Sequence, residues 1–172
     1  MELLERFARG DTDAFETLFR QYQTDVYRWI VKMVRDRAAA EELTVETFWR
    51  IWRSRARFDP GREFGAWARR VAANVAVDHL KTLRRDASLP DEWPATPGPD
   101  RAQDRDTRDA IREAFGRLPA RLRVVATLVF IEERPYGEIA ETLGISVGAV
   151  KARAFRAVRL LRKKLERMGV KP

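Results

Sequence analysis

Basic side chains are concentrated in one stretch near the end of the sequence. Residues 146–167 hold eight lysines and arginines against one acid, Glu166, and the whole chain of 172 residues carries a net charge of +8. Lysine and arginine bind phosphate oxygens, and arginine also reads guanine edges in the major groove of DNA. A charge excess confined to one segment is typical of a nucleic-acid footprint. These residues therefore predict non-covalent binding of DNA.

A helix, a tight turn and a second helix would position these cations. Pro135 predicts the start of the first helix, because proline is tolerated there but not inside a helix. Ile139 and Leu143 then recur at helical spacing. Gly144 suits a C-terminal turn, and Ser146 is a good N-cap for the next helix. This order is typical of a helix-turn-helix, whose second helix enters the major groove by its N-terminal end.

The second helix is expected to bury one side and to present the other to DNA. At about 100° per residue, the expected core side comprises Val147, Val150, Ala154, Val158, Leu161 and Leu165. The opposite side, small at first and cationic further along, comprises Ala149, Ala152, Arg156, Lys163 and Arg167. A solvated helix without a partner, or a helix on a membrane surface, is the alternative. The capped turn and the few aromatic residues favour DNA.

The composition argues against several other kinds of site. There are no cysteines and a single histidine, His79, which excludes disulfides, thiolate metal sites and histidine clusters. No glycine-rich phosphate loop occurs, and no nucleophile lies beside His79. We therefore expect no enzyme activity, no catalytic residues, no metal and no cofactor. Without an apolar run of about 18 residues or a signal peptide, we expect a cytoplasmic protein with no membrane insertion.

The predicted fold is all-α, with two small helical domains and no strands, because strict alternation of apolar and polar residues is absent. Residues 1–85 form the first domain, and residues 108–172 form the second, which contains the helix-turn-helix. Between them, residues 86–107 carry four prolines and a net charge of −4, which predicts a flexible linker. Helices are expected over about 12–22, 26–37, 38–57, 64–85, 108–117, 120–131, 136–143 and 146–168.

Aromatic residues in the first domain suggest a second kind of DNA contact. Five of them interleave with arginines between residues 49 and 70, and unpaired bases are held by aromatic stacking beside a cationic groove. Most of the five are expected in the core, because small helical bundles need large side chains. Phe58 and Phe64, in or beside a loop, are the better candidates for the surface. The five residues are Trp49, Trp52, Phe58, Phe64 and Trp67.

Two stretches, in this order, resemble a known family. The segments 40–52, 57–64 and 67–80 look like region 2 of bacterial sigma factors, and residues 118–165 look like region 4. With only a proline-rich linker between them, the layout resembles the extracytoplasmic-function group. The resemblance implies a subunit that binds core RNA polymerase, through its β′ and β subunits, and promoter DNA, and that an anti-sigma factor holds inactive.

The resemblance also implies residue roles. The segment around Thr44 and Val45 departs from the family pattern, in which valine and glutamine usually stand at these two positions. The surface implied for polymerase comprises Glu41, Glu42, Val45, Glu46, Phe48 and Trp49. The −10 contacts implied are Arg57, Phe58, Phe64, Arg69, Arg70, Asn74, Asp78, Lys81, Arg84 and Arg85. The −35 contacts implied are Ser146, Ala149, Lys151, Ala152, Arg153, Phe155 and Arg156.

Two other functions stay open on the sequence alone. An autonomous helix-turn-helix regulator would account for residues 118–165 but not for the acidic and aromatic segment 40–52; co-purification with core polymerase separates the two. A nucleic-acid-modifying enzyme is disfavoured by the absence of cysteines, by the lone His79 and by the lack of a carboxylate cluster. Nuclease and deaminase assays with added metal would test it.

Overall fold

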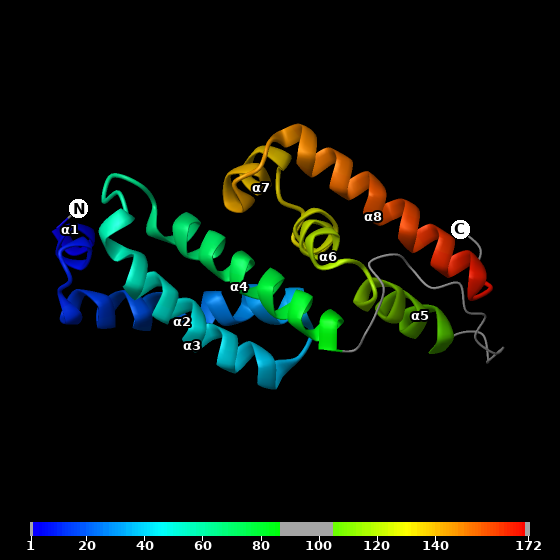
Figure 1. The fold of residues 1–172 in the computed structure, drawn as a ribbon, viewed down its shortest axis with the longest axis horizontal. Coiled ribbons are helices and arrows are strands. Elements are labelled where there is room, and N and C mark those ends of the chain that lie inside the picture. The colour runs from blue at the N-terminus through cyan, green and yellow to red at the C-terminus, as the bar shows by residue number, and fades with distance from the viewer. Residues whose placement is uncertain (1, 87–104, 171–172) are drawn as a thin grey trace. The chain divides into compact units, whose positions relative to one another are not determined.

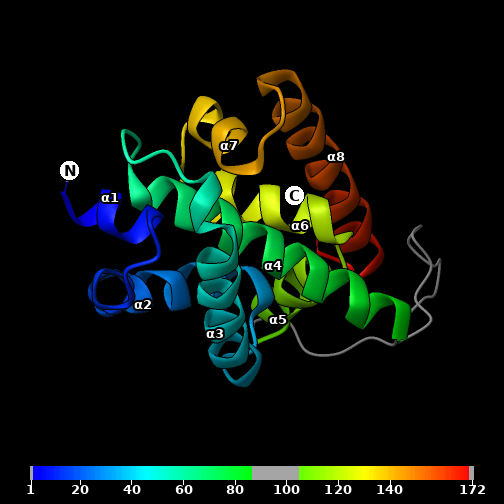
Figure 2. The ribbon, with the colours of Figure 1, turned by 60° about the vertical axis from the view of Figure 1, so that its left-hand side comes forward.

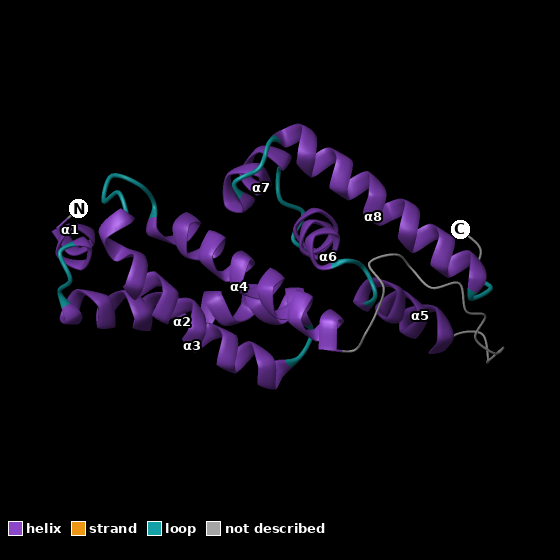
Figure 3. Ribbon diagram, viewed as in Figure 1, coloured by secondary structure: helices purple, strands orange, loops and turns teal. Residues whose placement is uncertain are grey.

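The computed structural model describes residues 2–86 and 105–170, and within these ranges every regular element is helical (Figure 3). The described chain divides into two compact units, one formed mainly by the residues up to Asp78 and the other mainly by those from His79 onward. The predicted all-α class is confirmed. Most of the predicted linker, residues 87–104, lies outside the described residues. The helices are α1 Glu2–Ala8, α2 Thr12–Val34, α3 Arg37–Ser54, α4 Phe64–Asp86, α5 Arg105–Gly116, α6 Ala120–Ala126, α7 Tyr136–Leu143 and α8 Val147–Arg167, with short turns η1 Arg55–Arg57 and η2 Thr127–Ile131 (Figure 1).

The first unit is built on α2, which packs along α3. The Asp11 carboxylate caps α2 by accepting from the backbone N–H groups of Asp13 and Ala14, at 2.9 and 3.0 Å. Arg35, in the left-handed region with φ of 57°, ends α2, and Asp36 caps α3. The sequence predicted two helices, over 12–22 and 26–37, where the structure has the single helix α2, and it did not predict α1. Helix α2 runs without a break because no glycine or proline interrupts it.

A cluster of aromatic rings, Phe7, Phe58, Phe64 and Trp67, joins α1, the loop before α4 and the start of α4. Ring centroids lie 5.6 Å apart for Phe7 and Phe64, and 4.8 Å apart for Phe58 and Trp67. Phe58 is 6% exposed and Phe64 is 2% exposed. The expectation that these two rings face solvent is therefore wrong. Their position beside a loop does not expose them, because α1 covers the loop.

The second unit centres on a core formed by α5, α6 and α8. Phe115, Leu118, Leu122, Ala126 and Ala157 pack together there, with Leu160 and Leu161 at the edge. The helix expected over 120–131 changes form after Ala126. Its last turn, η2, is a π-type turn in which the N–H of Glu132 bonds to the carbonyl of Thr127 at 3.0 Å. Helix α5 begins three residues earlier than predicted.

The aromatic cluster generates a stability prediction. We expect Phe58→Ala to destabilise the first unit by about 3–5 kcal/mol, because it removes a buried ring and leaves a cavity. Trp49→Ala is the matched control: its ring is 55% exposed, so truncation should cost less than about 1 kcal/mol. Urea unfolding followed by tryptophan fluorescence measures both. Equal, small effects would mean that Phe58 is not a core residue.

Candidate nucleic-acid interface

The turn between α7 and α8 fixes where the basic helix begins. Gly144 has φ of +65°, a conformation that suits glycine. The N–H of Gly144 bonds to the carbonyl of Glu141, and that of Ile145 to the carbonyl of Ala140 at 3.0 Å, which is the Schellman pattern. The Ser146 hydroxyl then accepts from the N–H of Ala149 at 3.1 Å. Figure 2 shows α7 and the start of α8 joined by this short turn, the arrangement of a helix-turn-helix.

Helix α8 buries a different side from the one expected. Ala157, which was not in the expected stripe, is buried together with Val150 and Ala154, whereas Val147 and Val158 are exposed. The predicted core side was centred on Val147. In the structure, α5 and α6 pack against the side of α8 that holds Ala157. The predicted core stripe is therefore correct for Val150 and Ala154 and wrong for Val147 and Val158.

One of the eight basic residues of this stretch turns inward. Lys164 is buried, and its Nζ lies 3.8 Å from Oε1 of Glu113 on α5. This contact ties the end of α8 to α5, so Lys164 belongs to the core and not to the phosphate surface. No local pattern predicts this contact, because lysine at a surface spacing is usually solvated.

The outward side of α8 holds most of the residues expected to read DNA. The side chains of Lys151, Ala152, Phe155 and Arg156 are exposed on the first three turns. Arg153 is half-buried. Burial, and then the nearby charge of Arg121, lowers the pKa of the Arg153 guanidinium. Further along, the exposed basic residues are Arg159, Arg162, Lys163 and Arg167. This side can therefore approach base edges near its start and phosphates further along.

Two of the expected −35 contacts, Ser146 and Ala149, are part of the N-terminal cap of α8. The Ser146 hydroxyl is used as the cap, and Ala149 is half-buried beside it. The N–H of Ala149 is used by this cap, which fixes the first turn of α8. We assign these two residues to positioning the helix.

Five of the residues expected to contact melted DNA share one exposed side of α4. Their spacing of three and four residues keeps them in line along the helix. The carboxylate of Asp78 is held there by Arg50 of α3, whose Nη1 lies 2.7 Å from Oδ2. The five residues are Arg70, Asn74, Asp78, Lys81 and Arg85.

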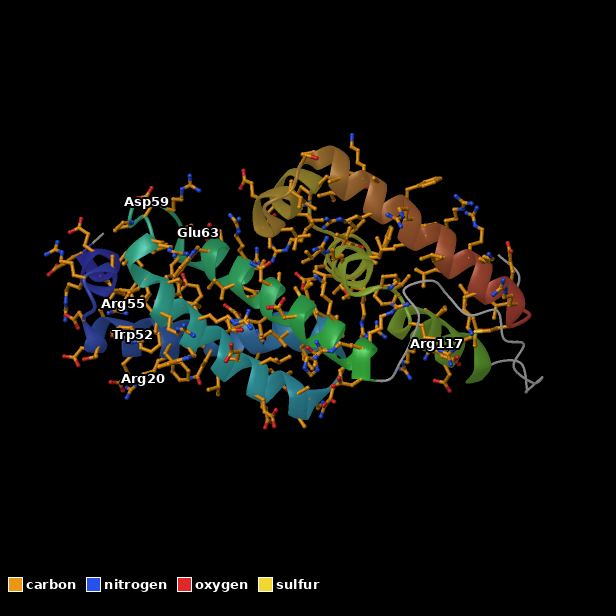
Figure 4. All side chains as sticks on the ribbon, in the orientation of Figure 1. Arg20, Trp52, Arg55, Asp59, Glu63 and Arg117 are labelled. Carbon is orange, nitrogen blue, oxygen red and sulfur yellow. The ribbon has the colours of Figure 1, made fainter. Side chains whose placement is uncertain are left out.

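The other five expected −10 contacts lie elsewhere. The Arg69 guanidinium lies over the Trp29 ring, 4.5 Å from its centroid, and Arg84 is half-buried. Arg57 is exposed at the end of η1. Figure 4 shows Arg55, in the same turn, beside Trp52; the guanidinium lies 4.1 Å from the ring centroid. Phe58 and Phe64 are in the aromatic cluster, so the cationic surface here lacks their rings.

Helix α3 presents an acidic and apolar surface. Val45 is 66% exposed and Trp49 is 55% exposed, and Glu41 and Glu42 are exposed on the same side. Phe48 is buried and is not part of this exposed surface: on a helix it points about 100° away from Trp49, toward Phe15 and Phe19.

Arg50 is not among the site residues predicted from the sequence. Its Nε lies 2.7 Å from Oε1 of Glu46, and its Nη1 reaches Asp78. The hydrogen bonds that the guanidinium donates, first to Asp78 and then to Glu46, raise its pKa above the ordinary value. The spacing of four residues between Glu46 and Arg50 was the available signal for one of these pairs. Glu46 is thus engaged within the unit and is less available to a partner than Glu42.

An apolar groove of about 330 Å³ lies on the second unit, and Arg162 of the outward side of α8 is among the residues that line it. Ile111, Phe130 and Val158 line it and are exposed. No sequence signal distinguished these residues, because each lies at an apolar position that is equally consistent with a core. An exposed apolar surface of this kind favours a protein over phosphate.

Neither a cluster of metal ligands nor a membrane-spanning helix is present in the described ranges. No three acidic, histidine or cysteine side chains gather there as metal ligands would. None of the described helices combines the length and the apolar character needed to cross a membrane.

Comparisons with known proteins match both units. Residues 18–86 match the model of Sigma-70 region 2, and residues 108–161 match that of Sigma-70, region 4. The chain is 38% identical to RNA polymerase sigma factor CarQ of Myxococcus xanthus, over 94% of this chain and 95% of CarQ. It is 36% identical to ECF RNA polymerase sigma factor BldN of Streptomyces coelicolor, but spans only 64% of the length of that relative.

Solved structures agree on the fold. CnrH, in complex with the cytosolic domain of CnrY, aligns with a TM-score of 0.63 and 26% identity, covering 95% of both chains. Sigma factor RpoE of Bartonella quintana, solved with the anti-sigma factor NepR, aligns with a TM-score of 0.58 and 21% identity, covering 88% of this chain and 96% of RpoE.

The outward side of α8 generates a binding prediction. We expect Arg156→Ala to weaken binding to the DNA duplex that the chain selects by about 1–3 kcal/mol, because it removes a base contact. Lys163→Ala is the matched control from the same side: it should lower the salt dependence by about one unit without changing which sequence is preferred. Fluorescence anisotropy at several salt concentrations measures both. Unchanged affinity in a folded Arg156→Ala protein would contradict the assignment of this side.

Proposed function

Because the chain belongs to the sigma-70 family of RNA polymerase sigma factors, in its extracytoplasmic-function group, we propose that it reads promoters with two separate surfaces. Members of this family direct promoter-specific transcription initiation by RNA polymerase. The observation that carries the proposal is the ordered pair of matches, region 2 over residues 18–86 and region 4 over residues 108–161. The proposed domains are residues 1–85 and 108–172, joined by residues 86–107.

The −35 element is bound by the outward side of α8. Support comes from the capped turn, which presents the first turns of the helix, and from the exposed cations that follow them. Lys151 and Arg156 lie next to the small side chain of Ala152, so they flank a part of the helix that can approach base edges. Duplex DNA suits this surface because a single α-helix fits the major groove.

Melted −10 DNA is bound by the exposed side of α4 and by Arg57. Support comes from the alignment of Arg70, Asn74, Lys81 and Arg85 along that side. Asp78 acts by orienting Arg50 across to α3, since an acid facing phosphate would repel it. With Phe58 and Phe64 buried, base capture depends on polar and cationic groups here more than on stacking.

The surface for core RNA polymerase is the exposed side of α3. Of the six residues that the resemblance implied, it comprises Glu41, Glu42, Val45 and Trp49. An exposed tryptophan beside an exposed valine is a usual anchor of a protein interface. The acidic rim steers this side of a basic protein away from DNA and toward a basic partner surface. No bond chemistry is assigned to the chain; catalysis belongs to the polymerase.

An anti-sigma factor is a further proposed partner. RpoE, which shares this fold, was solved with the anti-sigma factor NepR. Here the exposed apolar groups on α3 and along the groove of the second unit give such a protein surfaces to cover.

Run-off transcription tests the function as a whole. Purified core polymerase with the chain should produce transcripts from a subset of a genomic promoter pool, and these promoters should share sequence elements near −35 and −10. Core polymerase alone is the control. If the complete chain adds no promoter-specific transcript to core polymerase, the proposed function fails; a protein that binds DNA but not polymerase would support the autonomous regulator instead.

The polymerase surface generates its own prediction. Glu42→Lys should weaken core binding at least tenfold, or about 1.4 kcal/mol, since it places a cation at an acidic rim. Trp49→Ala should weaken it by about 2 kcal/mol or more, as expected of an interface anchor. Glu16→Lys, an exposed acid on α2, is the matched control and should bind as the unmodified protein does. Pull-down of core polymerase measures the series. Wild-type affinity in Glu42→Lys and Trp49→Ala would remove this surface from the account.

A further inference from the structure

Asp78 is the one carboxylate in the line of five exposed residues on α4. Asn74 lies one turn before it and Lys81 one turn after it, and Arg70 and Arg85 complete the line. A carboxylate here repels the phosphates of a strand that lies along the cations. The position of Asp78 is therefore unfavourable for binding DNA unless its charge is neutralised.

Arg50 of α3 supplies the neutralising charge. Its Nη1 donates to Oδ2 of Asp78 at 2.7 Å, and its Nε donates to Oε1 of Glu46 at the same distance. Glu46 lies one turn earlier on α3, so it holds the guanidinium from its own helix while the guanidinium reaches across to α4. Distances this short are those of charge-assisted hydrogen bonds, which fix the geometry of both partners.

A contribution to stability is a weak explanation of this ion pair. The side chains of Arg50 and Asp78 are 38% and 56% exposed, and ion pairs this exposed contribute little to folding. Apolar groups such as Ile51 on α3 and Val75 on α4 provide the buried packing of the two helices. A role at the surface is the better explanation, because the pair lies on the side of α4 proposed to hold melted DNA.

We propose that Arg50 is a positioning residue for the melted −10 strand: by pairing with Asp78, it removes the repulsion that this carboxylate would exert on the phosphates of the strand. This inference rests on the proposed function. It gives α3 a part in DNA binding that does not require Arg50 to touch DNA. In this respect Arg50 differs from Lys81 and Arg85, whose charges act on the strand directly.

The test measures strand binding by holoenzyme, that is, the full chain with core RNA polymerase. The probe is a fluorescent non-template oligonucleotide that spans the −10 element of a promoter from which holoenzyme transcribes. Arg50→Met removes the charge and keeps an unbranched apolar stem. We expect it to weaken binding roughly three- to fivefold at low salt, the effect of two like charges about 5 Å apart in water. The loss should shrink at high salt, because salt screens exposed charges.

Removing the carboxylate separates neutralisation from a structural role. Asp78→Asn should bind the strand at least as tightly as the unmodified protein does. The double variant Arg50→Met with Asp78→Asn also lacks the ion pair, yet it should bind about as well as the unmodified protein. Arg50→Met with Glu46→Gln is the matched control: it removes the acid on α3 and should stay as weak as Arg50→Met. Circular dichroism checks that each variant is folded.

The contradicting results are distinct. If Asp78→Asn, alone or combined with Arg50→Met, binds as weakly as Arg50→Met, the ion pair acts only by holding α3 to α4 and the inference is wrong. Unchanged affinity in a folded Arg50→Met protein would contradict it as well. Failure of the proposed function differs from both: unmodified holoenzyme would then yield no promoter-specific transcript, or would bind this strand no better than one of scrambled sequence. Either result also overturns the inference, because it rests on that function.

Discussion

Burial of one side of α8 against α5 and α6 is the packing on which the proposed DNA-reading surface depends. A helix can present a fixed set of side chains to DNA only if the opposite set is held in place. Val150, Ala154 and Ala157 are small enough for α8 to approach its neighbours closely. Near the C-terminal end of α8, Lys164 forms an ion pair with Glu113 of α5. The Schellman turn at Gly144 and the Ser146 cap fix where this helix starts. Together, this packing and the capped turn determine that Lys151, Ala152, Phe155 and Arg156 face outward.

In the first unit, a comparable constraint acts through the aromatic cluster. Phe7 of α1 covers Phe58 and Phe64, so rings that a single strand could have stacked on are used to hold the loop before α4. The surface that remains is polar on α4 and apolar on α3. The Arg50 bridge between Glu46 and Asp78 joins these two helices, and it therefore relates the proposed polymerase surface to the proposed −10 surface.

Features with strong local signals were predictable from the sequence. The bounds of α7 follow from Pro135 and Gly144, whose backbone preferences act independently of tertiary packing. Burial was predicted less well, because it depends on what packs against a residue. Phe58 lies beside a loop and is buried, whereas Val158 lies at an apolar helical spacing and is exposed. Likewise, nothing local distinguished Lys164, whose partner Glu113 is 51 residues away in the sequence.

The central claim is that α8 reads duplex DNA while α4 holds a melted strand. Site-specific photo-crosslinking from holoenzyme on a selected promoter tests it most directly. A crosslinker at position 156 should label both strands near −35 whether or not the promoter is open. A crosslinker at position 74 should label only the non-template strand near −10, and only after melting. Labelling of closed duplex from position 74, or of no promoter DNA from position 156, would contradict the account.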